Sequence, residues 1–194
     1  NIVANSGGNS AGGAVDVKIA DIDGDGDMDI VSSSYSEKQI SWHENDGSST
    51  NWTSTVISED THPNGFYGAR GIHIADIDSD GDLDIVAATQ QNNRVAWFEN
   101  DGSTNPSFSS TVIATTAQDA RDVHVGDMDG DGDLDIVSAS NADDTIAWYE
   151  NDGAADPTFT AADIATNADG AEDVKIADID GDGDLDIVSA SHGD

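Results

Sequence analysis

A nine-residue acidic loop occurs four times in this chain, and its near-constant spacing limits what the chain can fold into. The copies begin at Asp21, Asp76, Asp127 and Asp178, which lie 55, 51 and 51 residues apart. Each copy has aspartate at positions 1, 3, 5, 7 and 9 and glycine at position 6. Alternate carboxylates on a tight turn can converge on calcium, which accepts many oxygen ligands at loose geometry. The glycine permits the sharp backbone reversal that brings position 9 back toward position 1. The loops therefore predict about four Ca²⁺ sites, one in each repeat.

The predicted ligands are the side chains at positions 1, 3, 5 and 9 and the backbone carbonyl at position 7. The residues assigned to these metal sites are Asp21, Asp23, Asp25, Asp27, Asp29, Asp76, Asp78, Asp80, Asp82, Asp84, Asp127, Asp129, Asp131, Asp133, Asp135, Asp178, Asp180, Asp182, Asp184 and Asp186. Ser79 replaces glycine at position 4 of the second loop, where no side-chain ligand is needed, so we expect that site to survive. Acidic runs also occur in disordered chains, but these four share one register and have strand-like flanks.

An EF-hand is excluded by what surrounds each loop. That motif needs a bidentate glutamate at position 12 and a helix on each side. Position 12 is Ser32, Ala87, Ser138 or Ser189 here, and none of these chelates a cation. Apolar residues at every second position precede each loop, and Asp-Ile-Val follows it, a pattern typical of strands. Each loop is therefore predicted to join two strands.

A second motif keeps the same period. Trp-x-Glu-Asn-Asp-Gly occurs at 42–47, 97–102 and 148–153, after a strand-like run and with a turn predicted at its end. An aromatic residue and another short strand-like run follow, beginning at Trp52, Phe108 and Phe159. One repeat thus holds four short strands in about 51 residues, which predicts a β-propeller blade. The repeated tryptophans are predicted to be core between blades rather than platforms for a ligand.

The acidic loop followed by Ile-Val, together with the Trp-x-Glu-Asn-Asp-Gly segment, resembles the FG-GAP/VCBS repeats of integrin-like β-propellers. The resemblance covers essentially the whole chain. It implies an all-β propeller, Ca²⁺ at the loop aspartates, and secreted or surface-exposed proteins that include adhesion modules and sugar-binding propeller lectins. It also implies rings of about seven blades, whereas this chain has four loops and three tryptophan segments. We therefore expect residues 1–194 to form one repeat domain that starts and ends within a blade, as a segment of a larger propeller. A closed four-bladed ring is the alternative.

Composition excludes several partners. The chain has 40 acidic and 6 basic residues, a formal charge of −34, which argues against nucleic acid and anionic membranes because both require a basic face. No apolar run is long enough to predict a transmembrane segment, and without cysteine there is no disulfide framework. Low-affinity calcium loops fill where calcium is abundant, so we expect an extracellular protein, secreted or on the cell surface.

The basic residues recur at related repeat positions on the strands before the acidic loops. Lys18, His73, His124 and Lys175 share one position, and Arg70 and Arg121 share another. These strands would be innermost in a propeller, so the side chains are expected to gather near its axis. They would either bind an acidic sugar or carboxylate, or pair with neighbouring aspartates. An insertion near residues 61–67 adds two aromatic candidates for stacking on a sugar. The candidate ligand-binding residues are therefore Phe66, Tyr67, Arg70, His73, Arg121 and His124.

No set of residues in the sequence matches a catalytic motif. A nucleophile elbow, a phosphate-binding loop and a His-Glu-x-x-His pattern are all missing. We expect a non-enzymatic module for adhesion or for recognition of a glycan or surface protein, attached to further blades or domains. A purely structural spacer is the alternative. A propeller-type polysaccharide lyase that uses His62, Tyr67 or His73 as its base is a third hypothesis, supported only by fold analogy.

Overall fold

The computed structural model describes residues 13–48, 51–58 and 68–193, and this part of the chain is built from β-strands and one short 3₁₀ helix, η1 (Gln90–Asn92). The strands form three four-stranded antiparallel sheets and one two-stranded sheet. The sheets are, in chain order, β1 (Ala14–Ala20), β2 (Asp29–Ser34), β3 (Gln39–Asn45) and β4 (Trp52–Ser58); β5 (Ala69–Ala75), β6 (Asp84–Thr89), β7 (Arg94–Asn100) and β8 (Phe108–Ala114); β9 (Ala120–Gly126), β10 (Asp135–Ser140), β11 (Thr145–Asn151) and β12 (Phe159–Ala165); and β13 (Ala171–Ala177) with β14 (Asp186–Ser191). The predicted all-β repeat of four strands is confirmed.

Each sheet is a meander in which consecutive strands pair. The acidic loop closes the hairpin between the first two strands, so that Ala20 lies opposite Asp29 in the first sheet. The third strand lies on the other side of the second, with Trp42 opposite Val31. β-branched and aromatic residues on these strands fit a pleated surface that is buried on both sides.

The Asn-Asp-Gly sequence at the end of the third strand opens a connection longer than a two-residue hairpin turn. In the second sheet this connection covers residues 101–107, between β7 and β8. Asp101 organises it by accepting hydrogen bonds from the backbone N–H groups of Ser103 (3.2 Å) and Ser107 (3.1 Å). The fourth strand then begins at the aromatic residue, Phe108.

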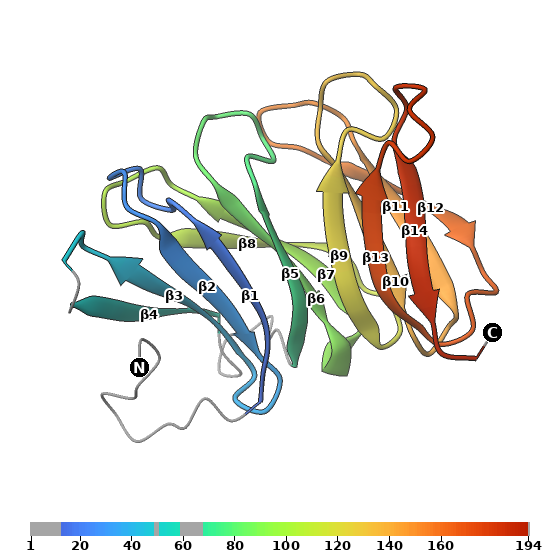
Figure 1. Ribbon diagram of the computed structural model, residues 1–194, viewed down its shortest axis with the longest axis horizontal. Helices are drawn as coiled ribbons and strands as arrows, with labels where there is room; N and C mark the ends of the chain where they lie inside the picture. Colours follow the sequence, from blue (N-terminus) through green and yellow to red (C-terminus); the bar gives the residue numbers. More distant parts are fainter. Residues whose placement is uncertain (1–12, 49–50, 59–67, 194) are drawn as a thin grey trace.

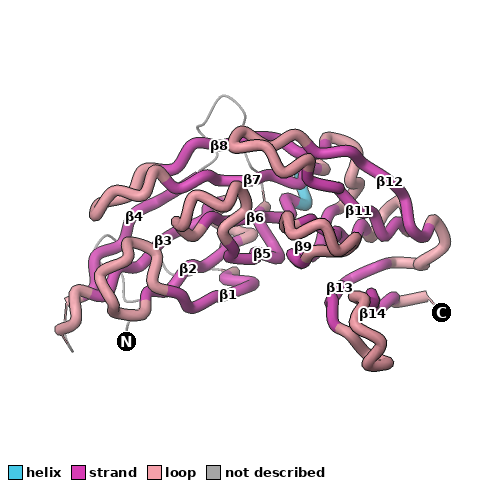
Figure 2. Tube along the Cα trace, turned by 90° about the horizontal axis from the view of Figure 1, so that it is seen from above, coloured by secondary structure: helices cyan, strands magenta, loops and turns pink. Residues whose placement is uncertain are grey.

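The sheets are arranged as successive blades around a common axis. Figure 2 shows them in an arc, with β1, β5 and β9 on its inner side and β4, β8 and β12 on its outer side. The innermost strands contact each other from blade to blade: β1 contacts β5, β5 contacts β9, and β9 contacts β13. The strands before the acidic loops are therefore the innermost ones, as expected from the repeat.

The hydrophobic core lies between blades. One cluster joins Ile22, Val31 and Trp42 of the first blade to Ile72 and Phe98 of the second. Equivalent clusters join the second blade to the third and the third to β13 and β14. Because a blade covers its faces only against its neighbours, the stability of the array comes from these interfaces.

The tryptophans of the third strands belong to this core. Trp42 and Trp97 are buried, at 1% and 2% relative exposure, and Trp148 packs against the third cluster while partly exposed. The prediction that these residues are core rather than ligand platforms agrees with their burial. Apolar side chains at the two ends of the array, such as Ile19 (68% exposed) and Val188 (52%), are exposed because no further blade among the described residues covers them.

Candidate functional site

The four acidic loops lie along one edge of the array, the upper edge in Figure 1. This placement follows from topology: the innermost strands all run in the same direction, so every loop from a first strand to a second strand leaves at the same end. Three carboxylates gather in each loop, each offering an oxygen atom within 4.8 Å of the others. The groups are Asp21, Asp23 and Asp25; Asp76, Asp78 and Asp80; Asp127, Asp129 and Asp131; and Asp178, Asp180 and Asp186. Four groups, one in each repeat, can therefore hold a metal ion.

Backbone N–H groups within each loop orient these carboxylates. In the first loop Gly26 donates to Oδ2 of Asp21 (3.0 Å), Asp25 donates to Oδ1 of Asp23 (3.2 Å), and Asp27 donates to Oδ1 of Asp25 (2.8 Å). Gly26 has a φ of +97°, which glycine adopts without strain. The second oxygens of Asp21, Asp23 and Asp25 take no part in these hydrogen bonds.

Ser79 occupies position 4 of the second loop with a φ of +61°, close to the +71° of Gly24 at the same position of the first. The backbone therefore keeps the shape of the loop although a side chain is present, at the cost of a left-handed conformation for a non-glycine residue. Asp76, Asp78 and Asp80 still form a group, so the substitution preserves the arrangement of carboxylates.

Two observations show that the loops fit a hard cation. Oδ1 of Asp21 and Oδ1 of Asp76 are buried and have no hydrogen-bond partner among the described residues. A buried carboxylate oxygen without a partner is costly, and a cation satisfies it. Burial also raises the pKa of Asp23 and Asp78, and neighbouring aspartates raise it further. Carboxylate oxygens are the ligands that calcium prefers.

The position 9 aspartates of the first three loops lie outside these groups of three and are held by the third strand of their own blade. Oδ1 of Asp29 accepts a hydrogen bond from the backbone N–H of Asn45 (2.8 Å), and Oδ2 accepts from Ile22 N–H (3.2 Å) and from the indole N–H of Trp42 (2.9 Å). Asp84 and Asp135 accept the equivalent backbone bonds, and all three aspartates are buried. Burial raises the pKa of Asp84 to about 7.

The fourth loop differs because the described chain contains no third strand after β14. Asp186 accepts a bond from the backbone N–H of Ile179 (3.0 Å), and it joins Asp178 and Asp180 in the carboxylate group. The assignment of position 9 as a metal ligand in the first three loops stays a prediction, as does the role of the position 7 carbonyls.

The Trp-x-Glu-Asn-Asp-Gly motif is thus part of the loop site, which the sequence analysis missed. Its asparagine binds the position 9 aspartate, and its glycine lies against the position 7 aspartate: a Cβ on Gly102 would lie 1.9 Å from Oδ2 of Asp82. The sequence feature that indicates this role is the constant offset of 16 residues between the position 9 aspartate and the asparagine.

The structure brings His73 and His124 together near the axis, with ring centroids 4.4 Å apart in an edge-to-face arrangement. The pKa of His73 is lowered to about 4, mainly by burial and in smaller part by the nearby charges of His124, Lys18 and Lys175. Burial is also the main cause of the lowered pKa of His124. Both imidazoles are therefore neutral at pH 7.

The cations around them are paired with acidic side chains. Lys18 Nζ lies 2.6 Å from Asp16, and Lys175 Nζ lies 2.8 Å from Asp122 and 2.6 Å from Asp173. Of the arginine candidates, Arg121 pairs with Asp119 (2.7 Å) and Glu172 (3.3 Å), while Arg70 donates to Oε1 of Gln90 (3.0 Å). Pairing with neighbouring acids, one of the two predicted alternatives, therefore describes Lys18, Lys175 and Arg121. The two aromatic candidates, Phe66 and Tyr67, and His62 lie outside the described residues.

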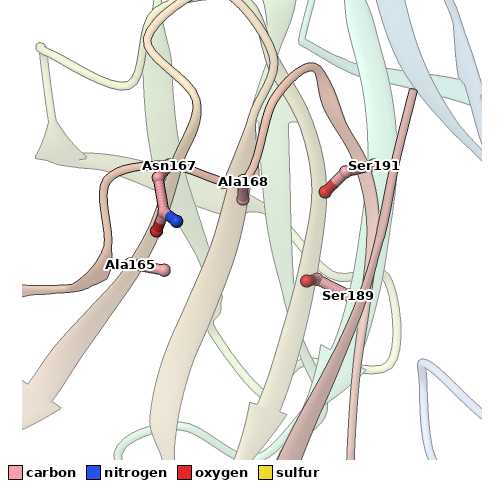
Figure 3. Close-up of a pocket in the computed structure, with 5 residues that line it drawn as sticks. All are labelled: Ala165, Asn167, Ala168, Ser189 and Ser191. Carbon is pink, nitrogen blue, oxygen red and sulfur yellow. The ribbon is translucent and has the colours of Figure 1, made fainter. Parts of the chain in front are cut away.

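A cavity of about 370 Å³ lies between the third blade and β14, lined by Ala165, Asn167, Ala168, Ser189 and Ser191 (Figure 3). Ser189 and Ser191 correspond to Ser138 and Ser140 of the third blade, which lie opposite residues of β11. The cavity therefore occupies the place that a third strand fills in a complete blade, and none of the predicted ligand-binding residues lines it. No helix in the described part of the chain is long and apolar enough to span a membrane.

Comparison with known proteins gives one family and several similar folds. The model of the FG-GAP-like repeat matches the chain three times, over residues 21–87, 76–138 and 127–189, each match running from one acidic loop through the next. Among curated proteins, no sequence matches significantly.

Two solved structures illustrate the similarity of fold. The first is a lectin from Agrocybe aegerita, described for its specific recognition of non-reducing terminal N-acetylglucosamine; it has a TM-score of 0.62 and 23% identity over 97% of this chain and 50% of the lectin. The second is rhamnogalacturonan lyase YesW, with a TM-score of 0.58 and 13% identity over 91% of this chain and 40% of the lyase. The chain spans half or less of the length of these proteins, and at such identities the likeness concerns the fold alone.

Proposed function

Because the chain belongs to the FG-GAP-like repeat family, we propose that it is a calcium-stabilised β-propeller module that recognises a glycan or a surface protein outside the cell, without catalytic activity of its own. The observation that carries this proposal is the recurrence of three converging carboxylates in all four loops, along one edge of the array. Sites of this kind fill where calcium is abundant, which supports an extracellular location.

The role of calcium in this proposal is structural. Each loop crowds five aspartates between two strands, and a bound ion removes their mutual repulsion. An ion at 100 times its dissociation constant adds about 2.7 kcal/mol to the stability of the folded state. Four such sites together approach the whole free energy of unfolding of an ordinary domain, about 5–15 kcal/mol.

The proposed ligand is a glycan, and the inner strands supply its candidate site. The fold similarity to a lectin that recognises terminal N-acetylglucosamine supports this choice. His73, His124 and Arg70 lie on inner strands, and neutral imidazoles can both donate to and accept from sugar hydroxyls. The spacer hypothesis is the second candidate, and the pairing of Lys18, Lys175 and Arg121 with acids favours it.

A glycan and acidic-polysaccharide array, probed with the chain in calcium and again with chelator, tests the proposal. We expect saturable binding that chelation abolishes and that Arg70→Ala weakens. Arg94→Ala is the matched control, because it removes the same charge from the start of β7, outside the inner strands. A blank array, with calcium still raising the melting temperature, would favour the spacer. Release of unsaturated sugar products, seen as ultraviolet absorbance, would instead establish a lyase.

A further inference from the structure

Two buried asparagines connect the acidic loops of neighbouring blades. The side-chain amide of Asn100, on β7, donates one hydrogen bond to the carbonyl of Leu83 in its own loop (3.1 Å) and another to the carbonyl of Ile22 in the preceding loop (3.0 Å). Asn151 does the same one blade later, bonding Leu134 (3.1 Å) and Ile77 (3.0 Å). Both asparagines are almost fully buried, at 1% and 2% relative exposure.

These bonds join the hydrogen bonds of the position 9 aspartates into one continuous network. Asp29 accepts from Ile22 N–H, and the Ile22 carbonyl accepts from Asn100. The backbone N–H of Asn100 donates to Asp84, which also accepts from Ile77 N–H. The Ile77 carbonyl accepts from Asn151, whose backbone N–H donates to Asp135. We call this network the asparagine relay; its members are Asp29, Ile22, Asn100, Asp84, Ile77, Asn151 and Asp135.

The relay touches the first and second loops beside their metal groups. Ile22 lies between Asp21 and Asp23, and Ile77 lies between Asp76 and Asp78, so the carbonyls that Asn100 and Asn151 bind belong to residues flanked by members of the metal groups. An ion that fixes those carboxylates also fixes the peptide between them. The asparagine passes this restriction to the next loop, where it holds both the position 8 carbonyl and the position 9 carboxylate.

We propose that the asparagine relay couples the first three metal loops, so that they fill cooperatively. The inference rests on the calcium binding proposed above and concerns its regulation. An ion in one loop orders part of the next loop in advance, and the second ion then loses less conformational entropy on binding. The members of the relay are buried and hydrogen-bonded to one another, so displacing one of them leaves a buried polar group without its partner. In the described chain no asparagine bonds both the third and the fourth loop, so the fourth loop serves as the uncoupled comparison when residues 1–194 are titrated.

Each loop carries its own reporter for the test. The N–H of the position 6 glycine donates to the position 1 carboxylate in all four loops, at 3.0–3.2 Å. The amide resonances of Gly26, Gly81, Gly132 and Gly183 therefore report on the loops one by one when the ¹⁵N-labelled chain is titrated with Ca²⁺. We expect the first three to shift together, with Hill slopes above 1, and Gly183 to shift separately.

In Asn100→Ala the amide resonances of Gly26 and Gly81 should no longer shift at the same calcium concentration. Calcium binding to the first and second loops should weaken at least fivefold, the usual lower limit for coupled sites. The second and third loops should stay coupled through Asn151. Asn45→Ala is the matched control: its side-chain amide bonds the Met28 carbonyl of its own loop (3.2 Å), and among the described residues it bonds no second loop. It should weaken the first loop and leave the coupling intact.

Three results separate the two proposals. If no glycine amide responds to calcium, the proposed calcium binding fails and the relay has nothing to couple. If all four loops fill independently, or if Asn100→Ala leaves the coupling unchanged, the relay is overturned while calcium binding stands. Should Asn100→Ala fail to fold, Asp23→Asn with Asp25→Asn disables the first loop without touching the relay. Binding to the second loop must then weaken at least fivefold, and an unchanged affinity overturns the proposal.

Discussion

Replacing one carboxylate of a metal group should change the stability of the protein in opposite directions with and without calcium. Asp78 is the best position for this test, because its carboxylate lies within 4.8 Å of those of Asp76 and Asp80. Two unit charges at that separation repel by roughly 1 kcal/mol even at the dielectric constant of water. Asp78→Asn removes two such repulsions, so in chelator it should raise the free energy of unfolding by about 1–2 kcal/mol.

In calcium the same substitution should lower stability, because it removes a ligand and weakens the ion in the second loop. If the wild-type site is filled at 100 times its dissociation constant, the loss approaches about 2.7 kcal/mol. For a chain of this size each kcal/mol moves the melting temperature by roughly 2–4 °C. Asp78→Asn should therefore melt a few degrees higher than the wild type in chelator and about 5–10 °C lower in calcium.

Urea denaturation and thermal melting at one fixed ionic strength measure both effects, since salt screens the repulsion. Asp156→Asn is the control: it removes the same charge from an exposed position outside the loops, and it should have little effect in either condition. A variant that is destabilised equally with and without calcium would refute the argument, because its carboxylate would then act through the fold alone. A variant that is stabilised to the same extent in calcium as in chelator would show that the second loop holds no ion.

Three further predictions concern the core, the second loop and the axis. Trp97→Ala should cost about 3–5 kcal/mol in urea denaturation, and Trp148→Ala should cost less because its side chain is only partly buried; equal losses would contradict the inter-blade core. Ser79→Gly should stabilise the protein by about 0.5–1 kcal/mol and Gly130→Ser should destabilise it similarly, since both positions have positive φ; a stabilising Gly130→Ser would be inconsistent with this strain. The pKa of His73 is lowered from 6.5 to about 4, so the unfolded chain takes up its proton first as the pH falls. Stability should therefore drop between pH 6.5 and about 4, by up to about 3 kcal/mol relative to His73→Asn, and a pH-independent difference between the two proteins would rule this out.

Local features of this fold could be predicted from the sequence because they repeat. The acidic loop, the strands on both sides of it and the tryptophan of the third strand lie within one repeat, so periodicity alone defined a four-stranded blade. His73 and His124 were expected near the axis because the strand before each acidic loop would be innermost in a propeller, and the structure places their ring centroids 4.4 Å apart. Two alternatives were open for the basic residues, and the structure shows that Lys18 and Arg121 pair with acids.

The hydrogen bonds between blades could not be predicted from the sequence because they depend on how one blade stacks on the next. Asn100 bonds a carbonyl 78 residues earlier in the chain, and no local pattern indicates that partner. The Asn-Asp-Gly sequence was interpreted only as a turn, although its asparagine holds Asp84 and its glycine makes room for Asp82. These roles become visible only when the third strand is placed beside the loop.

The location of all four acidic loops along one edge has an electrical consequence. Five aspartates in each loop place 20 of the 40 acidic residues on that edge, so the metal-free molecule is strongly polarised from one end of its blades to the other. The field of such a molecule turns an approaching polyanion toward the opposite edge before any contact forms. Four divalent ions add eight positive charges at the acidic edge and reduce this asymmetry. Calcium concentration would then set not only how firmly the blades hold together but also the orientation in which an acidic polymer first meets them.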